Sequence, residues 1–235
     1  MSPSTLGFFG TVAHRREAAR VFAASVVITA VLAALTTSFA TRPSWLELVG
    51  TSTGLCNVWL LRKQNVVAWF FGIVSVTAVG LVFYRLGLMG QAWLHLFYFF
   101  PINWWAWYHW VRGGEQRTEL QVSWTNPKEW LVYVPLFLVA TYLVAGFFDR
   151  IYDRAIFVYW DATIVAASVV AQWLLSRKKI ESWILWVGPV DASAIILFSL
   201  TGAHMFSALY IVFLLNASAA IYEWREDWNA AQARR

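Results

Sequence analysis

The residues best suited to chemistry are a few polar side chains that interrupt long apolar runs of this sequence. Asp191 stands near the middle of one run, and a carboxylate at the centre of a membrane helix costs roughly 2.5–3.5 kcal/mol. Asn103 and Asn216 stand in two other runs. Groups that costly to bury are functional candidates by default. For Asn57 and Gln172 the alternative stays open that they serve only as hydrogen-bonding glue between helices.

These side chains suit binding of a solute. Trp186 lies about one and a half helical turns before Asp191, where an indole face can stack on a planar ring and attract a cation by about 0.5–2 kcal/mol. No Lys or Arg stands inside a run away from its ends, which favours a neutral or cationic ring carrying hydroxyl groups. Trp183 follows a basic loop closely, so a role as an interfacial anchor stays open beside a binding role. The candidate binding residues are Trp183, Trp186, Asp191, Asn103, Asn216, His95, Trp107, Asn57 and Ser75.

Other kinds of chemistry find little support in the sequence. An intramembrane enzyme would need a nucleophile with a base or a metal cluster, and only single histidines such as His95 and His204 are available within or beside the runs. Cys56 is the one cysteine, so no intrachain disulfide can form. The net charge of +5 is scattered over short loops, whereas nucleic-acid binding needs a continuous basic face. We therefore expect no enzyme activity, no cofactor, no metal site and no nucleic-acid partner.

The elements that must position the candidates are membrane helices. Hydrophobic residues make up 60% of the chain and charged ones 13%, far from the roughly 25% charged content of soluble domains. A bilayer-spanning helix needs about 20 mostly apolar residues. Eight runs of suitable length are predicted, at 20–40, 45–61, 66–84, 91–111, 130–148, 158–175, 183–201 and 205–224.

The orientation follows from Lys and Arg, which concentrate in cytoplasmic loops. With the N-terminus inside, 14 basic residues lie on the cytoplasmic side and 4 outside, so both termini are predicted to be cytoplasmic. The first run, with Ser38-Phe39-Ala40 at its end, also resembles a secretory signal. We interpret it as a peripheral first helix.

An internal repeat organises the remaining runs. At an offset of 114 residues, 59–110 align with 173–224 without a gap, with eleven of 52 positions identical. Three of the matches pair tryptophans, among them Trp69 with Trp183. Each copy holds three runs and one run lies between them, which predicts two parallel three-helix repeats in a 3+1+3 core; such repeats place a substrate site near the midplane. The predicted divisions are 1–40 (N-terminus and first helix), 41–111 (first repeat), 112–157 (linker with the central helix), 158–224 (second repeat) and 225–235 (cytoplasmic tail). Asn103 and Asn216, separated by one residue less than the offset, are expected to face each other across the pseudo-axis.

Over about residues 44–224 the sequence resembles the PnuC family of bacterial nicotinamide riboside transporters, whose fold is related to that of SWEET sugar transporters. The motifs of the first half that carry this resemblance are Ser44-Trp45-Leu46-Glu47-Leu48-Val49-Gly50, Asn57-Val58-Trp59-Leu60, Trp69-Phe70-Phe71-Gly72-Ile73-Val74-Ser75-Val76, Asn103 and Trp107-Tyr108 with Trp110. Those of the second half are Tyr159-Trp160-Asp161, Arg177-Lys178, Glu181-Ser182-Trp183-Ile184-Leu185-Trp186, Asp191 and Asn216.

The resemblance implies a homotrimer in the bacterial inner membrane that takes up nicotinamide riboside (vitamin B3) by facilitated diffusion, through a central site of Trp, Asn and acidic residues, for NAD biosynthesis. The sequence departs from the family pattern at His95, where many members carry Gln. The stretch Phe100-Pro101-Ile102-Asn103 and the interval from Trp186 to Asp191 are each one residue longer than usual. Relatives with such changes carry thiamine, riboflavin or deoxynucleosides, which remain alternatives, as does a non-transporting membrane scaffold.

Overall fold

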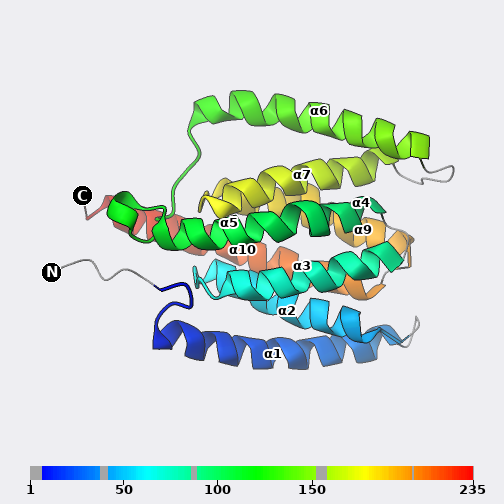
Figure 1. The fold of residues 1–235 in the computed structure, drawn as a ribbon, viewed down its shortest axis with the longest axis horizontal. Coiled ribbons are helices and arrows are strands. Elements are labelled where there is room, and N and C mark those ends of the chain that lie inside the picture. Colours follow the sequence, from blue (N-terminus) through cyan, green and yellow to red (C-terminus); the bar gives the residue numbers. More distant parts are fainter. Residues whose placement is uncertain (1–6, 38–41, 86–88, 152–157, 203, 235) are drawn as a thin grey trace.

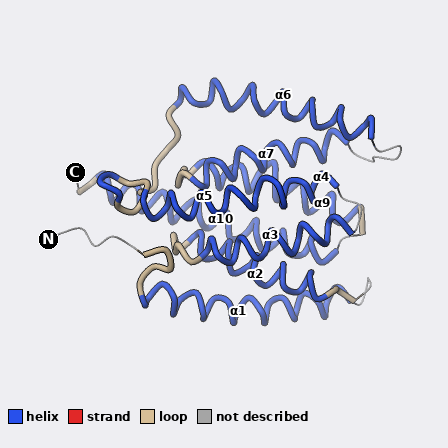
Figure 2. The backbone as a smooth tube through the Cα atoms, in the orientation of Figure 1, coloured by secondary structure: helices blue, strands red, loops and turns tan. Residues whose placement is uncertain are grey.

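The computed structural model describes residues 7–37, 42–85, 89–151, 158–202 and 204–234. Within these ranges the chain is helical apart from loops and one isolated backbone bridge between Ser123 and Lys179 (Figure 2). The elements are α1 (Val12–Thr37), α2 (Trp45–Arg62), α3 (Ala68–Arg85), α4 (Met89–Trp93), the π-helix η1 (Leu94–Phe99), α5 (Phe100–Arg112), the 3-10 turn η2 (Glu115–Arg117), α6 (Pro127–Ile151), α7 (Val158–Ser176), α8 (Glu181–Leu185), the π-helix η3 (Trp186–Ala192), α9 (Ser193–Leu200) and α10 (His204–Gln232). The predicted all-α class is confirmed.

Six helical runs in the described part of the chain are long and apolar enough to cross a membrane: Val12–Thr37, Ala68–Arg85, Pro127–Ile151, Val158–Ser176, Glu181–Leu200 and His204–Gln232. They coincide with six of the predicted spans. The other two predictions, 45–61 and 91–111, correspond to α2 and to the run α4–η1–α5. That these two also cross the membrane, giving eight spans, stays a prediction.

Helix ends differ from the predicted ones where polar residues continue a helix. α1 begins at Val12 and α10 runs on to Gln232, because charged residues can extend a helix beyond the apolar stretch that hydropathy detects. The predicted divisions of the chain stay predictions, and Ser38-Phe39-Ala40 lies outside the described residues. The start of α2 shows its sequence cause directly: Ser44 and Glu47 form a capping box, in which each side chain bonds to the other residue's backbone N–H.

The helices lie roughly side by side, with α1 and α6 on opposite outer sides of the bundle (Figure 1). α1 packs on α2 and α10, and α6 packs on α7. α1 buries only Ala18, Ser25 and Thr29, and α6 exposes apolar side chains such as Leu131 and Tyr142. Such faces suit contact with lipid, and they leave the interior of the bundle to the helices between α1 and α6.

The loops that follow α2 and α7 share one backbone geometry. Gln64 and Lys178, 114 residues apart, both have positive φ angles, of 54° and 51°. The hydrogen bond from Asn65 N to Leu60 O has its counterpart from Lys179 N to Leu174 O. This likeness supports the parallel-repeat proposal independently of the matched side chains.

The two halves pack through their first and third helices. α2 contacts α10, and α5 contacts α7. At one end of the bundle, Trp69, Trp110, Trp183 and Trp224 are all buried, with edge-on contacts between Trp69 and Trp110 (5.0 Å) and between Trp183 and Trp224 (5.4 Å). These two pairs are related by the repeat offset. We call this the basic end, because it holds the basic loops 62–65 and 177–180 and the linker 113–126.

Candidate substrate cavity

A cavity of about 100 Å³ lies between the two halves of the bundle. Its walls come from α2, α3 and η1–α5 of the first half and from α7, α8–η3 and α10 of the second. The lining residues are Gly54, Asn57, Val58, Leu61, Ser75, Val76, Val79, His95, Phe99, Asn103, Gln172, Leu175, Trp183, Trp186, Asp191, Phe206, Leu209, Tyr210, Phe213 and Ala217. Ligand pockets usually measure roughly 300–1,000 Å³, so a vitamin-sized solute would need these walls to move apart.

Seven of the nine residues predicted from the sequence line this cavity: Asn57, Ser75, His95, Asn103, Trp183, Trp186 and Asp191. The other two belong elsewhere. Asn216 Nδ2 donates to the Val58 carbonyl (3.0 Å). Trp107 Nε1 donates to the Phe8 carbonyl (2.7 Å), beneath the N-terminal segment. The structure thus brings most of the candidates together, while their part in binding stays a prediction.

Amide side chains join the two halves beside the cavity. Gln172 Nε2 donates to Asn103 Oδ1 at 2.8 Å, and both residues are buried. Asn216 reaches Val58 on the other side of the pseudo-axis. Asn103 and Asn216 do not pair with one another as expected; each bonds instead to the first helix of the opposite half. Gln172 thus joins two helices and also lines the cavity, and whether it takes part in binding stays open.

His95 is held in one orientation. Its ring packs edge-on against Phe83 and Phe99, each at 5.1 Å between centroids. Nδ1 lies 2.8 Å from the Gln91 carbonyl oxygen, which can only accept, so Nδ1 carries the proton. The Gln91 side chain is fixed in turn by a bond to Asp161 Oδ1 (2.8 Å). In the neutral ring Nε2 is then left as an acceptor, on a residue that lines the cavity.

Three cavity-lining residues carry buried polar atoms without a hydrogen-bond partner among the described residues: Asp191 Oδ1, Trp183 Nε1 and Trp186 Nε1. Asp191 is only 1% exposed. An unpaired buried polar group costs about 1–3 kcal/mol, and more if it is charged. The walls of the cavity therefore hold one carboxylate oxygen and two indole N–H groups without a partner, and we expect a polar or cationic ligand to satisfy them.

Two π-helical segments carry four of the residues that line the cavity. η1 carries His95 and Phe99, and η3 carries Trp186 and Asp191. A π-turn widens the helix by one residue and is frequent at functional sites. η3 therefore accommodates the long interval from Trp186 to Asp191, and η1 directly precedes Phe100-Pro101. Pro189 lies inside η3, where a regular α-helix would set its ring against the carbonyl of the previous turn.

Sequence reasoning missed the aromatic wall. Phe99 and Phe213 both line the cavity, and they are an identical pair at the repeat offset, so the self-alignment contained a signal for them. Tyr210 packs on Phe213 at 5.4 Å, but nothing in the sequence distinguishes it from a tyrosine at the membrane interface.

The fold and the cavity together define a class, that of helical multi-span membrane proteins with a small, mainly apolar cavity that carries a few polar side chains between two similar halves. The model of a family described as nicotinamide mononucleotide transporter matches residues 44–226. The nicotinamide riboside transporter PnuC of Escherichia coli is 28% identical over 193 residues, covering 72% of this chain and 80% of the relative. The corresponding protein of Haemophilus influenzae is 22% identical over 187 residues, covering 78% and 80%.

A crystal structure described as that of the vitamin B3 transporter PnuC has the same fold. Its TM-score is 0.73 at 22% identity, with 92% of this chain and 97% of that chain covered. The chain belongs to the PnuC family of multi-pass inner-membrane transporters, and the resemblance seen in the sequence is confirmed.

Proposed function

We propose that this protein carries nicotinamide riboside across the bacterial inner membrane through the cavity between its two halves, by facilitated diffusion. The observation that carries the proposal is that one cavity is lined by Asp191, with an unpartnered carboxylate oxygen, and by Trp183 and Trp186, with unpartnered indole N–H groups. Nicotinamide riboside combines a positively charged pyridinium ring, a carboxamide and ribose hydroxyls. Its cation matches the carboxylate and the aromatic faces, and its oxygens match the indole N–H donors.

The same cavity favours the riboside over its phosphorylated form. None of the described residues that line it is Lys or Arg, and phosphate recognition depends on such charge-assisted donors. A phosphate placed near Asp191 would also face like charge. We therefore infer that the cargo is a nucleoside, although the family description mentions the mononucleotide.

The closed shape of the cavity fits a carrier that alternates between two states. In transporters built from parallel repeats, the substrate site lies at the interface of the repeats, which move relative to each other. The sequence contains no phosphate-binding loop, so the proposal requires no ATP. Eight spans in a 3+1+3 core, cytoplasmic termini, a homotrimer and the lack of enzyme activity belong to the same proposal; they rest on the charge partition, the internal repeat and the family resemblance.

A binding screen tests this proposal on the purified protein. Nicotinamide riboside, nicotinamide mononucleotide, thiamine, riboflavin and deoxynucleosides would be compared by thermal shift and titration. We expect nicotinamide riboside to bind most tightly, and Asp191→Asn to weaken it at least about tenfold, since one buried charge contact contributes 1.5–3 kcal/mol. Asp149→Asn, on the exposed end of α6, is the matched control and should bind normally. If another solute bound more tightly, that solute would take the place of nicotinamide riboside as the proposed cargo. Equal binding by the two variants would contradict the proposed binding site at Asp191.

A further inference from the structure

A row of four hydrogen-bonded side chains crosses the boundary between the two halves at the basic end. Gln64 Nε2 donates to Asp227 Oδ2 (2.6 Å). Lys178 Nζ donates to Gln64 Oε1 (3.3 Å) and to Glu119 Oε1 (3.0 Å). The row therefore runs Asp227–Gln64–Lys178–Glu119, and Gln64 is its member from the first repeat.

Lys178 is an unusual residue to find here, because its exposed fraction is 0%. Burial lowers the pKa of its ammonium group, and the neighbouring Glu119 carboxylate opposes that shift. Glu119 is partly exposed, whereas Lys178 is buried, and removing an ammonium group from water is costly compared with apolar packing. Lys178 does not line the inner cavity, the one between the two halves, so the proposed binding site does not explain why this lysine is buried.

The row lies just beyond the end of the cavity. Gln64 and Lys178 each follow by three residues a leucine that lines it, Leu61 and Leu175, and lie just after the ends of α2 and α7. The ammonium group of Lys178 also lies 4.7 Å from the centroid of the Trp110 ring. Trp110 belongs to the buried tryptophan cluster, whose member Trp183 is part of the cavity wall.

A second cavity of about 280 Å³ is lined by two members of the row, Gln64 and Asp227, together with Gln121, Val122, Ala230, Ala231 and Arg234. The row thus borders this outer cavity through Gln64 and Asp227, and through Lys178 it contacts the tryptophan cluster, whose member Trp183 lines the inner cavity.

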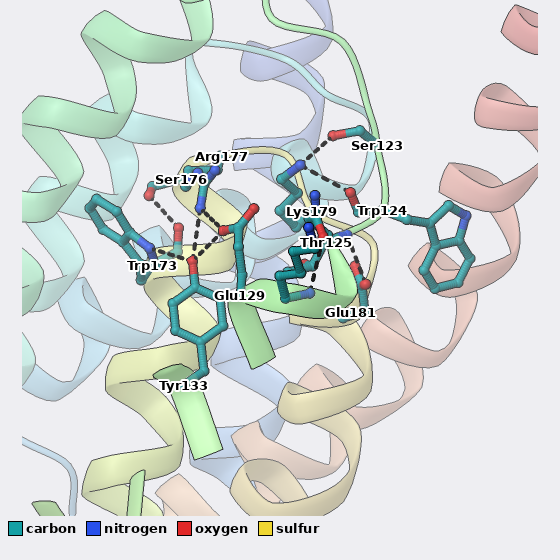
Figure 3. Close-up of polar contacts among 12 residues, drawn as sticks. Ser123, Trp124, Thr125, Glu129, Tyr133, Trp173, Ser176, Arg177, Lys179 and Glu181 are labelled. Carbon is teal, nitrogen blue, oxygen red and sulfur yellow. Dashed lines mark hydrogen bonds and ion pairs between the residues drawn. The ribbon is translucent and has the colours of Figure 1, made fainter. Parts of the chain in front are cut away.

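The linker binds the second repeat tightly, as Figure 3 shows. Ser123 and Lys178–Ile180 exchange two backbone hydrogen bonds of 3.1 Å, and the Thr125 N–H donates to Glu181. Arg177 bonds to Glu129 and Tyr133 at the start of α6. Lys178 and Asp227 belong to the second half, whereas Glu119 lies on a stretch of the linker whose Leu120 N–H donates to the Trp110 carbonyl of α5 (3.0 Å). The Gln64 side chain therefore bonds to two residues of the second half, Asp227 and Lys178.

We propose that this row is the closed gate of the transport pathway at the basic end, and that Gln64 withdraws from between Lys178 and Asp227 when that end opens. The inference rests on the proposed transport function for the existence of a pathway. Contacts that cross the repeat boundary at one end must separate when the repeats part there, whereas contacts within one repeat can persist. The row would thus make opening a discrete step.

The test measures access to the inner cavity without any substrate. Ala217 lines that cavity and is 1% exposed, so Ala217→Cys in a Cys56→Ala background provides a reporter. A small, charged, membrane-impermeant thiol reagent would be added separately to each face of sealed vesicles. Gln64→Gly removes the bonded side chain and suits the positive φ at this position. We expect it to speed labelling about tenfold, from the basic-end face only, because the closed state loses the contacts of Gln64 with Lys178 and Asp227, while the Lys63–Glu223 ion pair across the same boundary remains.

Gln116→Gly is the matched control. Gln116 has the same φ of 54° but is exposed on the linker, so its removal should leave labelling slow. Equal labelling rates for Gln64→Gly and Gln116→Gly would overturn the proposal. Since labelling needs no solute, this result is distinct from a failure to bind nicotinamide riboside, which would concern the proposed function alone.

Exchanging the two repeat-related residues, Gln64 and Lys178, is a second test of the gate. It does not depend on removing a side chain. In the double variant Gln64→Lys with Lys178→Gln, the new lysine faces Asp227 and the row can form again. We expect this double variant to label slowly, like the parent, and Lys178→Gln alone to label fast in protein that keeps its helical circular dichroism. A double variant that labels as fast as Gln64→Gly would contradict the gate.

Discussion

At the scale of single residues, the orientation of His95 bears most directly on which riboside is carried. Its Nδ1–H is committed to the Gln91 carbonyl, so a ligand meets an acceptor at Nε2. The carboxamide of nicotinamide riboside supplies an N–H donor, whereas nicotinic acid riboside presents a carboxylate that would face both Nε2 and Asp191. We expect the acid to compete with labelled nicotinamide riboside at least about tenfold more weakly, because a buried polar mismatch costs about 1–3 kcal/mol.

The substitution His95→Gln tests the same point from the protein side. A glutamine amide can donate as well as accept, so it should narrow the difference between the two ribosides. Competition assays on the parent and the variant measure this directly. An unchanged ratio would show that His95 does not meet the carboxamide.

The sequence led to residues that line the cavity where burial carries a large cost, while their part in binding stays a prediction. Asp191, Asn103 and His95 were found because polar groups in apolar runs are rare for energetic reasons. Trp107 and Asn216 were misplaced relative to the cavity, since the direction of a side chain depends on packing that no single run reveals. Asn216 lies beside the repeat boundary but turns to the Val58 carbonyl.

At the scale of elements, the π-helix η3 sets the spacing of Trp186 and Asp191. Deleting Gly188 in a Pro189→Ala background would allow a regular α-helix and rotate one residue by about 100° relative to the other, since a helix has 3.6 residues per turn. We expect this deletion to lower nicotinamide riboside affinity at least about tenfold while the circular dichroism stays helical.

Gly188→Ala in the same background is the control for that deletion. An added Cβ at Gly188 meets nothing within 4 Å. This variant therefore keeps the spacing of Trp186 and Asp191 without a steric clash and should bind normally. If the deletion also bound normally, the π-turn would have no part in positioning the site.

Hydropathy predicted where helices run, and it missed how they are interrupted. The runs 91–111 and 183–201 each read as one regular helix, yet they contain η1 and η3. A π-turn changes the register without changing the apolar character, so hydropathy cannot detect it, whereas a length comparison with relatives gave a hint. The proline at 189 was the local signal that a regular helix would be strained there.

At the scale of the whole molecule, the interface between the halves depends on buried amides as well as apolar packing. Asn103→Leu would leave Gln172 unsatisfied, and we expect a loss of about 1–2 kcal/mol in unfolding free energy. The double variant Asn103→Leu with Gln172→Leu should recover much of that stability, because neither partner is left unpaired. Unfolding in detergent with increasing denaturant measures both.

The same pair separates stability from function. If Asn103 and Gln172 also bind solute, the double variant stays unable to bind nicotinamide riboside although it is stable. A double variant that binds like the parent would assign the pair to packing alone.

The repeat is the feature of the whole molecule that the sequence predicted most fully. The offset that pairs Trp69 with Trp183 also pairs Gln64 with Lys178, whose loops share one backbone geometry. What the sequence could not show is that these two residues touch, because contacts across a pseudo-axis depend on how the copies pack.

Uptake by the purified protein in sealed liposomes tests the central claim most directly. Labelled nicotinamide riboside should enter with saturable kinetics, without ATP or an ion gradient, and stop at equal concentration on both sides. Asp191→Asn should lower this uptake at least about tenfold at low substrate concentration, and Asp149→Asn should not. The absence of saturable uptake in liposomes that hold folded protein, or equal uptake by the parent and Asp191→Asn, would contradict the account.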